Sequence, residues 1–273
     1  MLNFSRLFAL NETRIQEAAR LIAKNRLARI ALPSLSKNLC PNDVSEGYQL
    51  QREVHRILAN STLGRVIGHK IGATNARIQE MLGVHHPCSG GVYASTVFHG
   101  SAVLRLDNYV RPGIECEIAF RMGRDLPPRT EPYRREDLSE AIDACMVAME
   151  IIDDRYEDLA HIHVPTLIAD DTLDAGIVLG APHADWRNFD LQNVAGTIEV
   201  DGTEFSRGTG ANVLGHPLEA MVWIANLYSG QGRGLRAGEF VSTGSIADIY
   251  WAKAGNRIVA RVEGLGLVEA IFL

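Results

Sequence analysis

The sequence has 273 residues, 46% of them hydrophobic, and its 33 acidic and 27 basic residues give a net charge of -6. Such a chain can bury one large core, with or without a small extension. Charges of both signs are interspersed, which excludes a basic stripe for nucleic acid. No apolar run reaches the roughly 20 residues that span a bilayer, and the first ten residues are too short and too interrupted for a signal-peptide core. We therefore expect neither nucleic acid nor membrane as a partner.

The four cysteines are widely spaced and form no CxxC pair; they are Cys40, Cys88, Cys116 and Cys145. This spacing indicates neither a zinc knuckle nor a disulfide framework. A reducing compartment fits such cysteines best, and we expect a cytoplasmic protein.

The chain opens with two predicted helices. Residues 12–27 repeat apolar side chains at the 3.6-residue period, with Asn11 as the expected N-cap. A second helix is expected over residues 45–58, where Asp43 followed by Glu46 resembles a capping box. These helices predict an N-terminal helical layer.

From residue 64 onward, short β-like runs alternate with Gly, Pro and Asn, which predicts a largely antiparallel β body. Asp201-Gly202 predicts a type I′ hairpin turn. We expect a helical region over residues 1–62 and a catalytic β domain over residues 63–273. Two further helices are expected, over residues 134–145 and 216–230. The second has Pro217 in its first turn and Gly230 at its C-terminal end. Strands are expected over residues 239–246, 257–264 and 266–273.

Two carboxylates lie one residue apart in "RPGIECEIAF" (111–120). Residues i and i+2 of a strand share a face, so Glu115 and Glu117 point together. The run "VAMEIID" (147–153) adds one lone acid, Glu150, in an apolar setting. Buried carboxylates repel each other unless a cation or a proton intervenes, and oxygen ligands of this kind suit Mg²⁺ or Mn²⁺. The alternative is a solvated pair, such as Glu199 and Asp201 at the hairpin.

Lys70 lies in an apolar strand-like run, "GHKIGAT", beside Gly68 and Gly72. Glycines allow a substrate to approach the backbone closely, and a desolvated lysine near a cation has a lowered pKa suited to proton transfer. The alternative is a strand lysine whose amine reaches water.

Three further residues are candidate substrate contacts. Arg155 could bind a substrate carboxylate, but the sequence favours a surface ion pair within "DDRYED". Thr243 and Ser245, in "STGS", could offer hydroxyl or backbone N–H groups to a substrate, or could close a turn.

The order of motifs along the chain resembles that of the 2-hydroxypenta-2,4-dienoate (2-keto-4-pentenoate) hydratases and 4-oxalocrotonate decarboxylases of the fumarylacetoacetate hydrolase superfamily. The motifs are "GHKIGATNARIQEMLGV", "RPGIECEIAFRMGRDLP", "AMEIID", "GTGANVLGHPLEAMVWIANLY", "GEFVSTGS" and "VEGLG". The resemblance extends from about residue 12 to the end. It implies an α+β fold, a mixed β-sandwich roll with an N-terminal helical region, and a homo-oligomer. It also implies that Glu115, Glu117 and Glu150 bind Mg²⁺ or Mn²⁺ and that Lys70 is the catalytic lysine.

Two positions depart from that pattern. Cys88 stands where such hydratases tend to have an acidic residue, and Leu173 stands where they tend to have a serine. The resemblance implies that both positions face the substrate. A thiol and an isobutyl group remove one proton-transfer group and one hydrogen-bond donor from the expected site.

The resemblance implies a metal-dependent hydratase that adds water to a 2-hydroxy-2,4-dienoate to give a 4-hydroxy-2-oxo acid. A decarboxylase of a 2-oxo-3-enedioate and a hydrolase of an acylpyruvate share the requirement for a 2-oxo or 2-hydroxy acid. A non-catalytic keto-acid-binding protein is the alternative from another class, motivated by Cys88 and Leu173. Lys70 argues against it, because a pure binding protein needs no lysine in an apolar strand beside its ligand.

Overall fold

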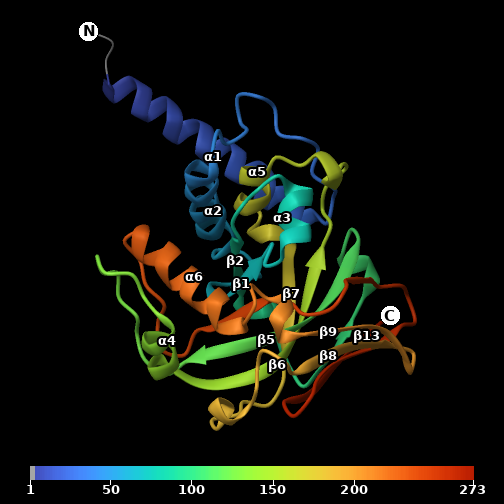
Figure 1. Cartoon of the computed structure of the whole chain (residues 1–273). Helices are drawn as coiled ribbons and strands as arrows, with labels where there is room; N and C mark the ends of the chain where they lie inside the picture. Colours follow the sequence, from blue (N-terminus) through green and yellow to red (C-terminus); the bar gives the residue numbers. More distant parts are fainter. Residues whose placement is uncertain (1–3) are drawn as a thin grey trace.

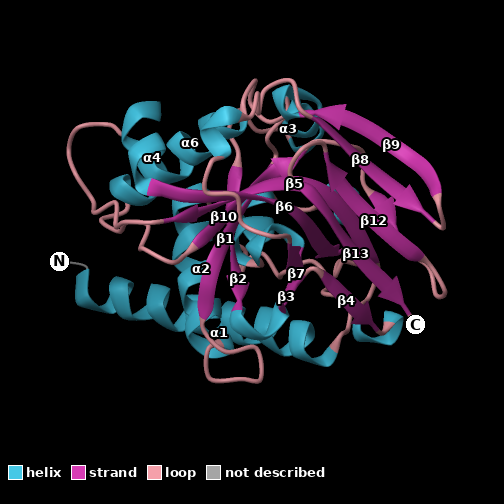
Figure 2. Cartoon of the chain, turned by 90° about the horizontal axis from the view of Figure 1, so that it is seen from below, coloured by secondary structure: helices cyan, strands magenta, loops and turns pink. Residues whose placement is uncertain are grey.

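The computed structural model describes residues 4–273, with side chains from residue 12 onward, as two mixed β-sheets with helices at one end and along one side (Figures 1 and 2). The larger sheet has the strand order β2-β1-β10-β5-β6-β7-β3, with β11 beside β5, and the smaller has the order β4-β13-β12-β8-β9. The larger sheet comprises β1 (Val66–Gly72), β2 (Cys88–Tyr93), β3 (Val97–His99), β5 (Pro112–Met122), β6 (Ile142–Asp153), β7 (Asp174–Leu179), β10 (Phe240–Ser245) and β11 (Tyr250–Trp251). The smaller comprises β4 (Ser101–Leu104), β8 (Ala195–Val200), β9 (Thr203–Thr209), β12 (Arg257–Val262) and β13 (Gly266–Phe272).

Most strand pairs are antiparallel, as predicted; the parallel pairs are β1 with β10, β3 with β7 and β4 with β13. The predicted hairpin joins β8 to β9. Asp201 and Gly202 have φ values of 52° and 84°, which are the two positive values that a type I′ turn requires. The predicted α+β fold class, with N-terminal helices, is confirmed.

The two sheets enclose the main hydrophobic core. Alternate residues of β5 and β6, such as Phe120 and Met149, face the smaller sheet and join one buried cluster with Ala260 and Val268. The intervening residues of β5 and β6 face the other side of the larger sheet. Strand alternation therefore gives this sheet one apolar face for the core and a second face for other groups.

The helices α1 (Phe4–Ala28), α2 (Val44–Leu58) and α5 (Val164–Ala169) gather at one end of the molecule, near β1 and β2 (Figure 1). Residues of α1 and α2, such as Ile22 and Val54, share a buried cluster with Tyr93 and Ile152 of the larger sheet. The helical region and the β body thus bury apolar surface against each other. The domain boundary at residue 62 stays a prediction.

Both predicted N-terminal helices form, with different starts. α1 begins at Phe4 rather than after Asn11. Asp43 caps α2 by accepting the backbone N–H of Glu46 at 2.9 Å. The Glu46 carboxylate accepts the N–H of Asn42 instead of that of Asp43, so only half of the predicted capping box forms.

The helix predicted over 134–145 is shorter in the structure. α4 (Arg135–Ala141) ends where β6 begins at Ile142, because residues 142–153 pair along almost the whole of β5. Pairing in the sheet overrides the helical pattern there. α6 (Pro217–Gly230) forms as predicted, and α3 (Ala76–Leu82) was not predicted. No helix within residues 4–273 combines the length and the apolar character needed to cross a bilayer.

Gly90 of β2 allows a loop to approach the larger sheet closely. It pairs with Lys70 of β1, and a Cβ atom at Gly90 would lie 2.3 Å from the carbonyl oxygen of Asp171. A side chain there would push residues 171–173 away from Lys70.

We predict that Gly90→Ala lowers the free energy of unfolding by about 1–3 kcal/mol, the usual cost of overpacking. The matched control is Gly230→Ala, because a Cβ atom there meets open space and the residue lies in a helix, where alanine is favoured. Denaturant unfolding of the three proteins measures both effects. Equal stability of Gly90→Ala and the parent would contradict the close approach.

Candidate metal centre and its surroundings

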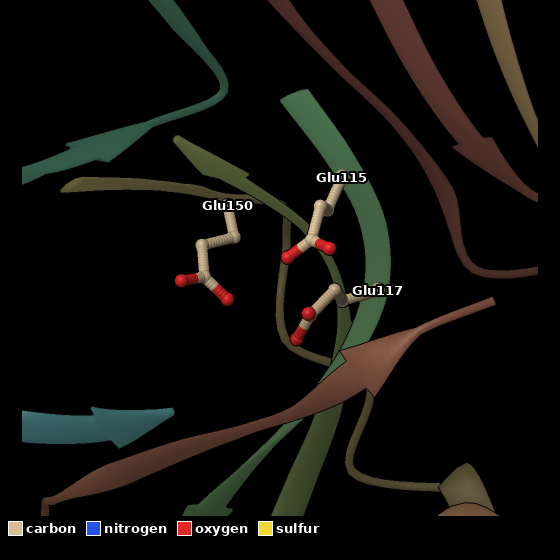
Figure 3. A group of neighbouring side chains, drawn as sticks. All are labelled: Glu115, Glu117 and Glu150. Carbon is tan, nitrogen blue, oxygen red and sulfur yellow. The ribbon is translucent and has the colours of Figure 1, made fainter. Parts of the chain in front are cut away.

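Three glutamates meet on the face of the larger sheet that lies away from the sandwich core. Glu115 and Glu117 extend from one face of β5, and Glu150 of β6 is the register partner of Glu115 (Figure 3). One carboxylate oxygen from each lies within 4.8 Å of the others. Glu117 and Glu150 are buried, whereas Glu115 is half-buried. The structure therefore brings the predicted acidic residues together, and the alternative of a solvated pair is wrong.

Some carboxylate oxygen atoms of this cluster accept hydrogen bonds from the protein, and others have no partner. Glu117 Oε2 accepts bonds from the Ser242 hydroxyl and from the Gly244 N–H, the latter at 2.9 Å. Glu117 Oε1 and Glu150 Oε2 are buried without a hydrogen-bond partner among residues 12–273. Buried polar atoms in native proteins are normally paired. An all-carboxylate set with free oxygen atoms fits a hard divalent cation.

Lys70 extends from β1 toward the same cluster. Its Nζ lies 2.8 Å from Glu150 Oε1 and donates a hydrogen bond of 2.8 Å to the carbonyl oxygen of Thr172. The residue is 2% exposed, so the alternative in which its amine reaches water is wrong. Glu150 is thus shared between Lys70 and the other two carboxylates.

The protonation of these groups reflects burial and mutual repulsion. Burial raises the pKa of Glu150 to about 7, with Glu115 adding to the rise and Lys70 opposing it. Burial also raises the pKa of Glu117 well above its usual value, and the charges of Glu150 and Glu115 add to that rise. Burial would lower the pKa of Lys70, but Glu150 and Glu115 outweigh it and raise that pKa above its ordinary value. This rise applies to the protein groups without a cation, and the lowered pKa expected for Lys70 beside a cation stays a prediction. A divalent cation among the carboxylates would oppose each of these shifts.

A left-handed turn leads from the end of α5 toward Lys70. Asp171, Thr172 and Leu173 have φ values of 54°, 52° and 71°. The left-handed region costs roughly 1–2 kcal/mol for each residue other than glycine. Three such residues in succession require strong support from their surroundings.

Asp171 supplies much of that support. Its Oδ1 accepts bonds from His55 Nε2 at 2.5 Å and from the Gly91 N–H at 2.8 Å. Its Oδ2 accepts bonds from Arg26 Nη1 at 2.9 Å and from the Tyr93 hydroxyl at 3.1 Å. Burial opposes ionisation, but these donors hold the pKa of Asp171 below its usual range. The carboxylate thus ties the turn to α1, α2 and β2.

Arg155 supports the other side of the turn. It is 3% exposed, pairs with Asp170 Oδ2 at 3.0 Å, and donates to the carbonyl oxygens of Leu173 and Asp174. Arg26 also pairs with Asp174, at 3.0 Å. The interpretation of Arg155 as a surface ion pair is wrong. Sequence reasoning missed this network, although three aspartates within "ADDTLD" beside an apolar run were a usable signal.

Cys88 and Leu173 both lie in apolar surroundings. Cys88 is fully buried in a cluster with Tyr48, Val164 and Ile168, and burial raises the pKa of its thiol to about 12. It is the register partner of Gly72, two residues from Lys70. Leu173 is 8% exposed and ends the left-handed turn. Neither side chain supplies an ionised group.

The hydroxyls predicted in "STGS" are bonded within the protein. Thr243 donates to the carbonyl oxygen of Ile118, and Ser245 donates to that of Ala247, which is a turn contact. The residues of this strand that reach the acidic cluster are Ser242 and Gly244. Sequence reasoning missed Ser242 and Gly244. The register of β10 shifts between Ser242 and Ser245, so that Ser245 is the partner of Glu117.

Comparisons with known proteins identify the family of this chain. Residues 88–272 match the family model of the fumarylacetoacetate (FAA) hydrolase C-terminal domain. The chain is 34% identical over 256 residues to a 2-keto-4-pentenoate hydratase of Burkholderia vietnamiensis, covering 93% of this chain and 95% of the relative. It is 34% identical over 258 residues to a 2-hydroxyhexa-2,4-dienoate hydratase of Comamonas testosteroni, covering 94% and 96%.

Among solved structures, the 4-oxalocrotonate decarboxylase from Pseudomonas putida G7 complexed with magnesium and adipate matches with a TM-score of 0.89 and 25% identity, over 96% of this chain and 98% of that chain. The same decarboxylase is also known with calcium and acetate. The fold and the relatives define the class as an enzyme of the fumarylacetoacetate hydrolase type. The chain belongs to the family of 2-keto-4-pentenoate hydratases and 4-oxalocrotonate decarboxylases within it.

We predict that Glu117→Gln leaves the metal-free protein as stable as the parent or more stable, because it removes one of three buried acids. The amide oxygen can still accept the bonds from Ser242 and Gly244. In the parent, Mg²⁺ at 100 times its Kd should add about 2.7 kcal/mol of stability. The variant should lose most of this gain.

Thermal unfolding after EDTA treatment, with and without added Mg²⁺, measures both effects. Glu263→Gln is the control, because Glu263 is an exposed acid away from the three carboxylates. An equal Mg²⁺-dependent rise in Tm for the Glu117 variant and the parent would exclude Glu117 as a ligand.

Proposed function

We propose that the protein is a metal-dependent hydratase that adds water to a 2-hydroxy-2,4-dienoate, of the 2-keto-4-pentenoate type, to give a 4-hydroxy-2-oxo acid. The observation that carries the proposal is the buried contact of Lys70 with a cluster of three carboxylates. Relatives named as hydratases cover almost the whole chain at 34% identity. A reaction that needs proton transfer beside a chelated acid suits this combination of groups.

Glu115, Glu117 and Glu150 would hold the cation, for which we propose Mg²⁺ or Mn²⁺. The buried oxygen atoms without partners are the structural support for this assignment. When bound, such a cation supplies Lewis acidity toward the 2-oxo acid head of the substrate.

Lys70 is the candidate for moving protons between the substrate and water. Its amine is held at 2.8 Å from both Glu150 Oε1 and the Thr172 carbonyl oxygen, so its position is fixed before a substrate binds. Cys88, the register partner of Gly72, and Leu173, the residue after Thr172, are both buried, which favours the exclusion of bulk water. Substrate contacts by Arg155, Thr243 and Ser245 stay predictions. Each of these side chains already forms hydrogen bonds within the protein.

A decarboxylase of a 2-oxo-3-enedioate is the second candidate. It is favoured by the likeness to 4-oxalocrotonate decarboxylase, with its TM-score of 0.89. Both reactions need a 2-oxo acid head and differ at the far end of the substrate. The acylpyruvate hydrolase and the non-catalytic binding protein have weaker support, because the solved fumarylpyruvate hydrolase is only 16% identical and Lys70 is retained. A homo-oligomer and a cytoplasmic location stay predictions.

The test follows the ultraviolet absorbance of freshly made 2-hydroxypenta-2,4-dienoate, with Mg²⁺ and with EDTA. We expect rapid, metal-dependent loss of absorbance by the parent protein. Lys70→Ala should lower the rate by about 10²- to 10⁴-fold, the range for loss of a proton-transfer group. Glu117→Ala should abolish the metal dependence, and Glu263→Gln should match the parent.

The same proteins are then given a 2-oxo-3-enedioate, with carbon dioxide release as the readout. Absence of dienoate turnover in the parent, with metal bound, would overturn the hydratase proposal. Carbon dioxide release in that case would establish the decarboxylase instead.

A further inference from the structure

Thr172 combines two unfavourable features at one residue. It has a φ value of 52°, although a β-branched residue rarely adopts positive φ. Its hydroxyl, Oγ1, is buried and has no hydrogen-bond partner among residues 12–273. A buried hydroxyl without a partner costs free energy that a valine of the same shape would avoid. No contact among residues 12–273 explains why a threonine stands here.

The position of Thr172 connects it to the catalytic lysine. Its carbonyl oxygen accepts the hydrogen bond from Lys70 Nζ at 2.8 Å. Its methyl group and the Lys70 amine both lie over Gly72, where an added Cβ atom would be 2.9 Å from Thr172 Cγ2 and 3.6 Å from Lys70 Nζ. Gly72 thus leaves room for the Thr172 side chain to lie beside the amine.

Other buried atoms without hydrogen-bond partners either belong to ion-paired residues or lie away from Lys70. Asp170 and Asp174 each use their second carboxylate oxygen in an ion pair with an arginine. Trp186 and Gln231 are not part of the turn or of the acidic cluster. The remaining atoms belong to Glu117, Glu150 and Thr172, which are grouped around Lys70. The Thr172 hydroxyl therefore belongs with the free carboxylate oxygens that await a ligand.

We propose that the Thr172 hydroxyl donates a hydrogen bond to an oxygen atom of the bound 2-oxo acid, and so is a substrate-binding residue. The proposal rests on the proposed function for the identity of this ligand. The oxygen atoms of a 2-hydroxy-2,4-dienoate are those of its carboxylate and of C2, because its tail is hydrocarbon. A donor beside Lys70 can therefore contact only this head group or the added water. Leu173, the next residue of the turn, offers no donor.

The test compares Thr172→Val with Thr172→Ser. Valine keeps the β-branched shape and removes the hydroxyl, whereas serine keeps the hydroxyl. The first readout is the affinity for 2-oxopentanoate, a saturated acid with the same head group, measured by calorimetry in the presence of Mg²⁺. We expect the valine variant to bind it about 10- to 100-fold more weakly, the range for loss of a hydrogen bond to a charged group. The serine variant should remain within a few-fold of the parent.

The second readout is the Tm of the metal-free variants. We expect Thr172→Val to match or exceed the parent, because an unpaired buried hydroxyl has been removed. Mg²⁺ binding without the acid should be unchanged, because Thr172 is not among the carboxylate ligands. Weaker ligand binding together with undiminished stability is the signature of a binding residue.

Three results would overturn the inference. Unchanged affinity of Thr172→Val for 2-oxopentanoate would exclude the contact, even if turnover fell, since the hydroxyl would then serve the added water. A clear drop in Tm would assign the hydroxyl a structural partner. Absence of 2-oxopentanoate binding by a parent that hydrates the dienoate would overturn this inference alone, and absence of both binding and turnover would overturn the proposed function as well. If 2-oxopentanoate binding depends on Thr172 but the parent does not hydrate the dienoate, only the proposed function would be contradicted.

Discussion

The burial of three carboxylates at one point of a β-sheet is the constraint on which the rest of the site depends. Glu115, Glu117 and Glu150 oppose one ammonium group, that of Lys70. When all four are ionised, two negative charges remain uncompensated, which equals the charge of one divalent cation. Burial and repulsion otherwise drive these acids toward protonation, as the raised pKa values of Glu117 and Glu150 show. The protein alone therefore stores an electrostatic cost that a cation would remove.

The helical region also supports the position of Lys70. Lys70 needs an acceptor on the side away from Glu150, and the Thr172 carbonyl oxygen supplies it from a left-handed turn. That turn is held by Asp171, whose donors include Arg26 of α1 and His55 of α2. The N-terminal helices thus help to fix the position of the turn that accepts the hydrogen bond from Lys70.

The acidic cluster could be predicted from the sequence because each glutamate stands out within its own strand. Alternation along β5 places Glu115 and Glu117 on one face, and Glu150 is conspicuous as a lone acid in an apolar strand. The fold class followed from the resemblance, and the hairpin at Asp201-Gly202 followed from its turn residues. The start of β6 at Ile142 was missed, because pairing with β5 overrode a helical pattern.

The network around Asp171 could not be predicted in the same way. Its donors come from residues 26, 55, 91 and 93, which no local periodicity relates to residue 171. In the sequence, "ADDTLD" has the composition of a solvated turn, and only the fold reveals that it is buried. Arg155 was misplaced for this reason, since its neighbours in sequence suggested water and its partners in space are the turn carbonyls.

Strain and unpaired polar atoms in this protein are concentrated beside Lys70. The left-handed turn and the free oxygens of Glu117, Glu150 and Thr172 each lower stability in the absence of ligands. The surrounding ion pairs of Arg26 and Arg155 offset this cost and keep the turn in place. Since the donors and acceptors are already positioned, binding a cation and an anionic acid needs little rearrangement of the groups that contact them. This preorganisation lets the interactions formed on binding contribute to affinity and catalysis rather than to ordering the site.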